Sequence, residues 1–221
     1  MEHGGRDTLI QELIEGGHLR TRCVIEAFRA IDRRDFVAKG YENEAYENYP
    51  LPIGYGQTIS QPLTVAFMLE LLQSDAGQRV LDIGAGSGWQ TAILAHVVSG
   101  GGVKEKKGKV IAIERIPQLA KVAQRNVGKY SFIGKGTASV LCADGSKGYP
   151  EEAPYDRIIA AASGRGIPQT WKEQLAIGGR IVAPVENSII LIEKVSKDEF
   201  KEQEYFGFSF VPLVEGPRDS V

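Results

Sequence analysis

The sequence contains few cysteines and no long apolar run. Its 221 residues include two cysteines, Cys23 and Cys142, which lie far apart and form no C-x-x-C pair. This excludes a disulfide framework and gives no sign of a zinc or redox motif. No apolar stretch approaches the ~18 residues that span a membrane, and residues 1–7 lack the apolar core of a signal peptide. We therefore expect a cytoplasmic protein without a membrane segment. We also expect Cys142, which lies on a predicted strand, to be buried.

An excess of positive charge is also missing. Lysine and arginine number 26 against 28 acidic residues, a formal net charge of −2, whereas nucleic-acid binders are usually basic. The one basic cluster, residues 104–109, is typical of a solvated surface loop. The three histidines are scattered and predict no metal site. We expect a monomer that binds neither nucleic acid nor metal.

Strands and helices alternate through the middle of the chain. Two helices are predicted first, over residues 9–14 and 21–31, and a third over 61–73. The alternation that follows indicates a mostly parallel sheet covered on both faces, with strands at 79–83, 110–114, 138–143, 156–161 and 179–185 and helices at 89–98, 117–130 and 168–175. Two antiparallel edge strands are expected at 189–195 and 205–213. The prediction is a single α/β domain, 1–221, divided into N-terminal helices and a loop (1–75), an α/β core (76–185) and C-terminal strands (186–221).

The segment VLDIGAGSGW leads from an apolar strand into a glycine-rich turn and a helix. Open α/β sheets bind ligands beyond the carboxyl ends of their strands. A dinucleotide fingerprint would need glycine at position 89, where Trp89 would crowd a pyrophosphate. Gly84, Ala85 and Gly86 are therefore predicted to approach a nucleoside ligand without pyrophosphate, and Asp82 to face a cation. S-adenosyl-L-methionine fits this pattern; a plain tight turn and an NAD site are the alternatives.

Acidic residues end the next two strands. Glu114 is predicted to accept hydrogen bonds from both ribose hydroxyls, although the insertion at 100–109 places it 30 residues beyond Gly84. Asp144 is predicted to receive the adenine amino group, with the backbone at Gly145 beside the ring. The alternatives are a solvated strand end for Glu114 and an Asp-Gly turn for Asp144.

A long loop, residues 40–60, precedes the third helix. Loops of this length are usually functional or disordered, and its aromatic residues argue against disorder. It ends in the segment GQTISQP, where Ser60 is a candidate N-cap and Pro62 is tolerated in the first turn. Because helix N-termini attract anions, Thr58 and Ser60 are predicted to hold a carboxylate if the loop folds over the glycine turn. The alternative is that Ser60 only caps the helix.

GQTISQP followed by VLDIGAGSGWQTAILA closely resembles the protein-L-isoaspartate O-methyltransferases. The glycine turn alone would indicate only some methyltransferase, and GQTISQP is far more specific. The resemblance continues in order along nearly the whole chain, through Ile113-Glu114-Arg115, Ala143-Asp144-Gly145, residues 154–159, Gln174-Leu175, Gly178-Gly179-Arg180 and residues 210–213.

The resemblance implies a Rossmann-like, doubly wound methyltransferase fold. It also implies S-adenosyl-L-methionine as donor, S-adenosyl-L-homocysteine as product, and isoaspartyl residues of damaged proteins and peptides as acceptors. Ser60 is implied beside the accepting carboxylate, as the catalytic residue, with Thr58 in the same loop. The remaining implied residues are Arg115 at the cofactor and Val211, Pro212 and Leu213 along the substrate backbone.

The chain also departs from the family pattern. Leu63-Thr64 stands where many relatives carry histidine or tyrosine and methionine, and residues 160–162 are all alanine where a threonine is common. These departures bear on peptide preference rather than on the reaction.

Two other functions remain open from the sequence. One is methylation of a small molecule or nucleic acid on the same fold, although no Asn- or Asp-Pro-Pro-aromatic segment for amino-group methylation is present. The other is a silent S-adenosyl-L-methionine-binding module, which would not require the hydroxyls of Thr58 and Ser60.

Overall fold

The structure is a computed structural model that describes residues 5–102, 107–214 and 216. These residues form a seven-stranded sheet in the order β5-β4-β3-β6-β7-β8-β9 and a separate hairpin of β1 and β2. The strands are β1 (Leu51–Gly54), β2 (Gln57–Ile59), β3 (Arg79–Ile83), β4 (Lys109–Glu114), β5 (Ala138–Cys142), β6 (Tyr155–Ala160), β7 (Leu175–Val185), β8 (Ser188–Lys194) and β9 (Phe200–Phe206).

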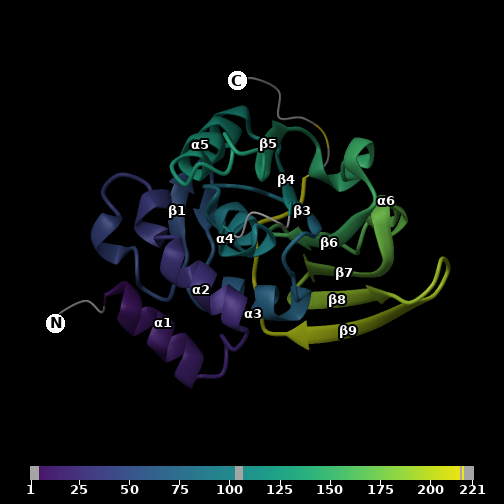
Figure 1. Ribbon diagram of the computed structural model, residues 1–221, viewed down its shortest axis with the longest axis horizontal. Helices are drawn as coiled ribbons and strands as arrows, with labels where there is room; N and C mark the ends of the chain where they lie inside the picture. The colour runs from purple at the N-terminus through teal and green to yellow at the C-terminus, as the bar shows by residue number, and fades with distance from the viewer. Residues whose placement is uncertain (1–4, 103–106, 215, 217–221) are drawn as a thin grey trace.

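The strand order reverses direction in the middle of the sheet. β3 pairs in parallel with β4 on one side and with β6 on the other, so successive crossovers leave this point in opposite directions. In open α/β sheets, ligands bind beyond the carboxyl ends of the strands at such a switch point. The pairs β7–β8 and β8–β9 are antiparallel and extend the sheet at its far edge (Figure 1).

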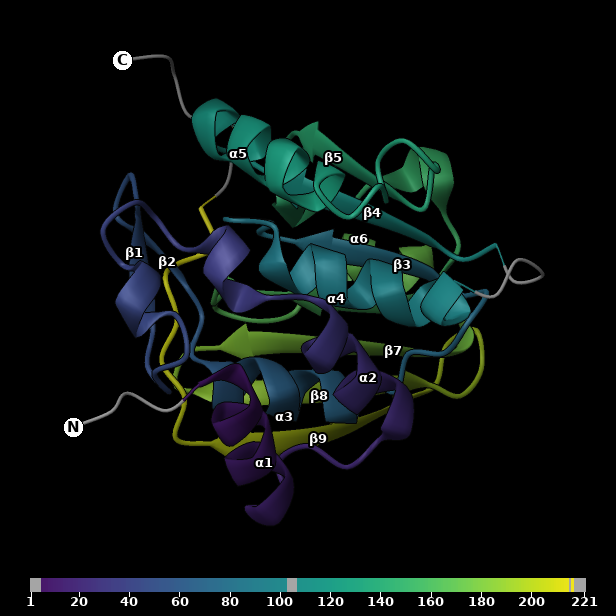
Figure 2. The same cartoon turned by 60° about the vertical axis from the view of Figure 1, so that its left-hand side comes forward.

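Helices cover the two faces of the sheet unequally. The described helices are α1 (Arg6–Glu15), α2 (Arg22–Ala30), α3 (Pro62–Leu72), α4 (Trp89–Val98), α5 (Pro117–Gly128) and α6 (Gln169–Gln174), with short 3₁₀ turns η1 (Arg33–Phe36), η2 (Glu42–Glu44), η3 (Gly100–Gly102), η4 (Gly145–Lys147) and η5 (Pro150–Glu152). Figure 2 shows α3, α4 and α5 in front of the sheet with α2 and α1 outside them, and α6 behind it. Alternate strand residues supply the two cores: Val80 and Val110 pack toward α3 and α4, whereas Leu81 and Ile111 pack toward α6.

Glu70 of α3 joins the N-terminal helices to the sheet layer. Its carboxylate accepts hydrogen bonds from the backbone N–H groups of Arg20 and Thr21 at 2.8 Å and from Thr21 Oγ1 at 2.7 Å. These bonds satisfy donors at the start of α2 that have no partner within the helix. The apolar faces of α1 and α2 then share one core with α3 and α4.

The predicted Rossmann-like α/β fold is confirmed, and β3 and α4 have the predicted bounds. Two expectations were wrong. The last strand was expected at 205–213, but β9 ends at Phe206 and the chain then leaves the sheet. Cys142 is exposed rather than buried, because β5 is an edge strand with one open side. Part of the basic cluster, residues 104–106, lies outside the described residues.

The loop predicted at 40–60 contains regular structure. β1 and β2 pair antiparallel, with Leu51 opposite Ile59, and both of these residues are buried. The hairpin stands beside the carboxyl ends of the central strands (Figure 2). Among the described residues, no helix combines the length and the apolar character needed to cross a membrane.

Candidate functional site

A narrow cavity lies beyond the carboxyl ends of β3, β4, β5 and β6, at the switch point of the sheet. Most of the predicted site residues line it together with apolar side chains; the lining residues are Gln57, Thr58, Ile83, Gly84, Gly86, Ile113, Glu114, Arg115, Ile116, Gly145, Ala161, Ala162, Val211, Pro212, Leu213 and Val214. The lining residues therefore come from three parts of the fold: the β1–β2 hairpin, the ends of four parallel strands and the chain after β9.

Two further hollows connect this cavity with the hydroxyl-bearing loop. Ser60 and Thr58 line a small one together with Gly84 and Gly86. The same two hydroxyl residues line a groove of about 690 Å³ bounded also by Val211. Thr58 lines all three spaces. The hydroxyl-bearing turn thus faces the glycine turn, and an open groove leads to it from the surface.

The glycine turn is held close to its neighbours by its backbone. The N–H groups of Gly84 and Ala85 both donate to the carbonyl of Ile113, at 2.8 and 3.0 Å. Gly86 has a positive φ of 54°, and a Cβ there would stand 3.3 Å from Ile53 Cδ1 in β1. Gly88, with φ of 89°, would place a Cβ 3.0 Å from the backbone oxygen of Ala123 in α5. The positive φ favours glycine at both positions, and at Gly88 a side chain would also meet the backbone of α5.

Asp82 lies beneath the turn rather than on the cavity wall. It is fully buried, and its carboxylate accepts hydrogen bonds from Gln90 Nε2 at 2.8 Å and Thr91 Oγ1 at 2.6 Å. Burial raises its pKa to about 6. Both oxygens thus bind the start of α4, and the cation contact predicted for Asp82 stays a prediction.

Glu114 is buried and has two roles, one in holding the glycine turn and one at the cavity wall. It lines the cavity, while Oε2 accepts from the N–H of Gly86 and Oε1 from the N–H of Ile116, both at 2.9 Å. Burial raises its pKa, against the effect of these two donors. Each carboxylate oxygen keeps a second lone pair, so Glu114 can fix the glycine turn and still accept from hydroxyls in the cavity.

Asp144 and Arg115 both hold the backbone of Gly216. The N–H of Gly216 donates to Asp144 Oδ2 at 2.9 Å, and its carbonyl accepts from Arg115 Nε at 3.5 Å. Asp144 also accepts from the N–H and Oγ of Ser146. Burial raises the pKa of Asp144, but these hydrogen bonds outweigh burial and leave its pKa below the ordinary value. Gly145 and Arg115 line the cavity, whereas Asp144 does not and is the N-cap residue of η4, directly before Gly145.

Ser60 does not cap α3, contrary to one of the two readings of the sequence. The N-cap residue is Gln61, and the side chain of Asn48 accepts from the N–H of Leu63 at 3.0 Å instead. Neither Ser60 Oγ nor Thr58 Oγ1 makes a hydrogen bond with another described residue. Ser60 is half-buried and Thr58 is exposed. Their hydroxyls are therefore available to a ligand in the shared cavity.

The chain after β9 forms the opposite wall. The N–H of Ser163 donates to the carbonyl of Val211 at 2.8 Å, and the N–H of Leu213 donates to the carbonyl of Ser163 at 2.7 Å. Val211, Pro212 and Leu213 line the cavity that the glycine turn also lines. The predicted substrate-backbone segment thus lies at the site although it is not the strand that we expected.

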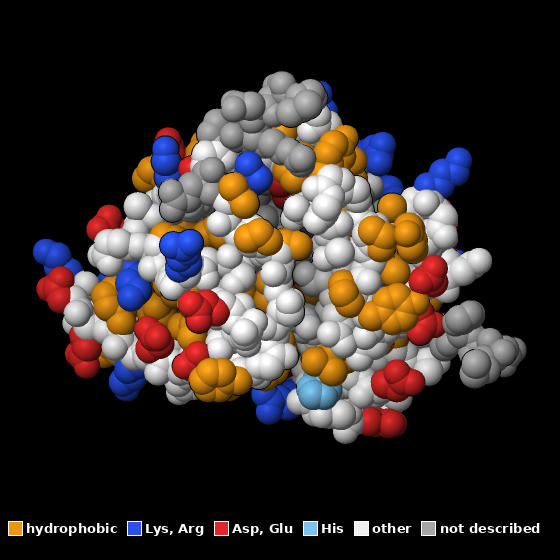
Figure 3. All heavy atoms as spheres, turned by 180° about the vertical axis from the view of Figure 1, so that it is seen from behind, with side chains coloured by type: hydrophobic (Ala, Val, Ile, Leu, Met, Phe, Trp, Pro, Cys, Tyr) orange, Lys and Arg blue, Asp and Glu red, His pale blue; other side chains and the backbone are white. Residues whose placement is uncertain are grey.

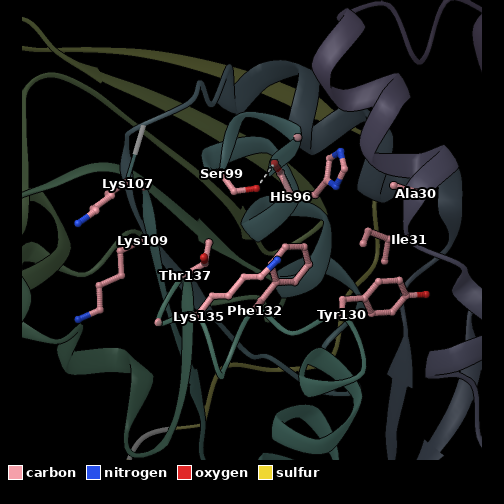
Figure 4. A pocket seen from close by; sticks show the side chains of 13 residues that line it. Ala30, Ile31, His96, Ser99, Lys107, Lys109, Tyr130, Phe132, Lys135 and Thr137 are labelled. Atoms are coloured by element: carbon pink, nitrogen blue, oxygen red, sulfur yellow. Dashed lines mark hydrogen bonds between the residues drawn. The ribbon is translucent and has the colours of Figure 1, made fainter. Parts of the chain in front are cut away.

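A cavity of greater volume than the one lined by Gly84 and Gly86 lies elsewhere. This cavity of about 720 Å³ opens at the amino ends of β4 and β5, and no predicted site residue lines it. Figure 4 shows Lys107 and Lys109 on one side of it and Ile31 and Tyr130 on the other. Ligands of open α/β sheets bind at the opposite, carboxyl end of the strands, so size does not identify the functional site here.

Comparisons with known proteins agree with this geometry. A family model described as protein-L-isoaspartate(D-aspartate) O-methyltransferase matches residues 4–218. A protein-L-isoaspartate O-methyltransferase from Methanopyrus kandleri is 41% identical over 213 residues, which cover 95% of this chain and 91% of the relative. One from Aeropyrum pernix is 42% identical over 210 residues, which cover 93% of this chain and 78% of the relative.

Solved structures share the fold. A structure described as a protein-L-isoaspartate O-methyltransferase superimposes with a TM-score of 0.80 at 30% identity, over 94% of this chain and 65% of that one. A Plasmodium falciparum protein, described as a member of this class in complex with S-adenosyl-L-homocysteine, has a TM-score of 0.84 at 23% identity, over 97% of this chain and 100% of that one. The chain belongs to the protein-L-isoaspartate(D-aspartate) O-methyltransferase family.

Proposed function

We propose that this chain methylates the free carboxylate of L-isoaspartyl residues in damaged proteins and peptides, with Ser60 orienting that carboxylate. As a member of the family it is an S-adenosyl-L-methionine-dependent enzyme. The observation that carries the residue assignment is that Thr58 and Ser60 line one cavity with Gly84 and Gly86. An acceptor held by the hydroxyls would therefore lie next to a cofactor held by the glycine turn.

The cavity walls suit the cofactor. Glu114 supplies an acceptor for ribose hydroxyls, and the side chains of Ile83, Ile113 and Ile116 offer apolar surface for a flat ring. Asp82 places a buried carboxylate under the turn, which favours a cationic ligand above it. We assign Gly84, Ala85 and Gly86 to the methionine part by their backbone.

Further residues complete the proposed cofactor site. We assign Asp144 and Gly145 to the adenine, with Arg115 beside them. Arg115 already approaches the tail residue Gly216 that Asp144 binds. The adenine contact of Asp144 therefore requires its bond to Gly216 to be shared or exchanged.

Methyl transfer to a carboxylate requires mainly that the carboxylate be positioned against the methyl donor. When bound, S-adenosyl-L-methionine supplies an electrophilic methyl group on a positively charged sulfur, and S-adenosyl-L-homocysteine remains after transfer. A free carboxylic acid has a pKa of about 4 and is ionised at neutral pH, so the protein has no proton to remove from it. The task of Ser60 and Thr58 is to donate hydrogen bonds that fix one carboxylate oxygen toward the cofactor. Such orientation can contribute several kcal/mol, up to about 7–11.

The groove beyond Ser60 suits a peptide. Val211, Pro212 and Leu213 present a backbone segment, fixed to Ser163, along which we propose that the substrate backbone lies. Leu63, Phe208 and Phe210 add apolar surface to the groove. Peptide preference next to the isoaspartyl residue is therefore proposed to be set by this apolar wall.

The decisive assay compares two peptides that differ in one linkage. Labelled methyl transfer is measured to an isoaspartyl peptide and to its normal aspartyl twin. We expect transfer to the first and almost none to the second. Transfer to neither peptide, with cofactor binding intact by calorimetry, would instead favour another acceptor or a silent binding module.

We also propose that the chain works as a cytoplasmic monomer, with residues 1–221 forming one domain, and that it does not act on nucleic acid. The shared core of α1 to α4 and the sheet supports a single unit. Figure 3 shows acidic and basic side chains of the described residues interspersed on the face turned away from Figure 1, without a dominant basic patch there. Size-exclusion chromatography with light scattering tests the monomer, and a dimer mass would contradict it.

A further inference from the structure

Arg33 holds a buried charge inside the loop that carries Ser60. It lies in η1 with 2% of its surface exposed. Its Nη1 donates to the carbonyls of Ala45 at 2.8 Å and Glu47 at 3.4 Å, and its Nη2 donates to those of Tyr49 and Ser60, both at 3.1 Å. One guanidinium therefore binds four backbone carbonyls, which lie 12 to 27 residues after Arg33 in the sequence.

The same guanidinium also contacts the cofactor side of the site. Its Cζ stands 5.3 Å from the ring centroid of Trp89, a distance typical of cation–π contacts. Trp89 begins α4 directly after Gly88 and lines the small hollow shared by Ser60 and the glycine turn. Arg33 is thus in contact with both walls between which the methyl group must pass.

The backbone at Ser60 depends on this contact. Ser60 lies between β2, which pairs only with β1 among the described strands, and the first turn of α3. Its carbonyl accepts from Arg33, while its hydroxyl has no partner among the described residues. The hydrogen bond from Arg33 therefore holds the backbone of Ser60, and with it the position from which Oγ extends.

The chemistry of this position favours arginine. A planar guanidinium offers five donors in a fixed arrangement and can bind several separated carbonyls, whereas an ammonium is a compact donor on a flexible stem. Burial lowers the pKa of Arg33 to about 10, so it stays charged at neutral pH. Its Nε is buried and has no hydrogen-bond partner within the described parts of the chain. Folding stability alone gives little reason for a buried cation, because replacing buried charged groups by apolar side chains of similar volume often leaves a protein equally stable.

From this arrangement we propose that Arg33 is a positioning residue for methyl transfer, which fixes the hydroxyl-bearing turn against the glycine turn by binding the carbonyl of Ser60 and the face of Trp89. This proposal rests on the proposed function, because it concerns the same carboxylate site. It predicts that loss of the guanidinium loosens the loop and slows turnover while cofactor binding survives.

The test uses Arg33→Met, Arg33→Lys and the neighbouring control Arg34→Met. Arg34 is exposed; its Nε donates to the carbonyl of Glu42, and its guanidinium lies over the ring of Tyr46. We expect Arg33→Met to lower kcat by about tenfold or more and to leave the cofactor Kd within about twofold of wild type. Arg33→Lys should recover part of kcat, and Arg34→Met should match wild type.

Amide hydrogen exchange supplies a readout that does not depend on the acceptor. Arg33→Met should speed exchange in residues 45–60 by about tenfold and leave β3 and α4 unchanged, because only the loop loses its fixed partner. If Arg33→Met does not fold, Arg33→Lys is judged by the same measurements. A wild type inactive on isoaspartyl peptide would refute the function and leave this readout valid.

The proposal is overturned by either of two results. In one, Arg33→Met keeps the wild-type kcat and the wild-type exchange in residues 45–60. In the other, kcat, cofactor affinity and exchange in the central strands all decline together in both Arg33 variants, as expected of a residue that only stabilises the fold.

Discussion

The two sides of the site are built in different ways. Much of the cofactor side is local in sequence: β3, the glycine turn and α4 occupy residues 79–98 without a break, and Glu114, Asp144 and Gly145 follow at the ends of the next two strands. The acceptor side is a hairpin and a turn whose backbone is held by hydrogen bonds with the side chains of Arg33 and Asn48. The difference suggests that cofactor binding and acceptor positioning can be impaired separately by substitution.

Removal of the Ser60 hydroxyl should have the largest effect. Ser60→Ala loses a hydrogen bond to a charged oxygen, worth about 1.5–3 kcal/mol, and is expected to lower kcat roughly 10- to 100-fold. Cofactor Kd should stay at the wild-type value, because Ser60 does not line the main cofactor cavity. Steady-state kinetics with calorimetry check both parts. Wild-type kcat in this variant would remove Ser60 from the mechanism.

Glu114→Ala should produce the opposite separation. The change removes the proposed ribose acceptor and also the partner of the Gly86 and Ile116 N–H groups. We expect cofactor Kd to rise by about tenfold or more. Glu151→Ala, an exposed acidic residue outside the site, serves as the control. An unchanged Kd in Glu114→Ala by calorimetry would contradict the assignment.

Asp82→Asn should weaken cofactor binding less, by about tenfold at most, while stabilising the unliganded protein. Burial raises the pKa of Asp82 from 3.8 to about 6, so keeping it ionised at pH 7 costs on the order of 3 kcal/mol. Because the pKa of Asp82 is higher in the folded than in the unfolded protein, wild type loses folding stability as the pH rises toward and through the folded-state pKa, whereas Asp82→Asn does not. The Tm gain of the variant over wild type should therefore grow between pH 4 and 7. A gain that does not change with pH would refute this account.

Asn48→Ala should have the smallest effect of these substitutions, and it tests the acceptor side. It removes the side-chain acceptor for the N–H of Leu63 at the start of α3, and loss of such a cap costs about 1 kcal/mol. We expect a few-fold rise in KM for an isoaspartyl peptide and no change in cofactor Kd. Weakened cofactor binding, with KM unaltered, would show that the two sides are not separable in this way.

The cofactor side was largely predictable because its signals are short-range. Strand, glycines and helix follow one another, and the bounds of β3 and α4 came directly from apolar pattern and glycine spacing. The exception is Asp82: nothing in the sequence indicated that Gln90 and Thr91 would turn toward it, although both lie in the first turn of the helix after the glycines.

The acceptor side was predictable only in part. Resemblance pointed to Thr58, Ser60 and residues 211–213, and the fold brings them together. The β1–β2 hairpin was missed because its strands are only four and three residues long and one of them contains Pro52. Arg33 and Asn48 were missed as well, since an arginine in a charged run looks like surface until the carbonyls it binds are known.

The most direct test is a crystal structure with S-adenosyl-L-homocysteine and an isoaspartyl peptide bound together. We predict that a carboxylate oxygen of the isoaspartyl side chain lies within hydrogen-bonding distance of Ser60 Oγ and points toward the cofactor sulfur beside Gly84 and Gly86. A peptide carboxylate bound away from Ser60, with the cofactor in place, would contradict the account.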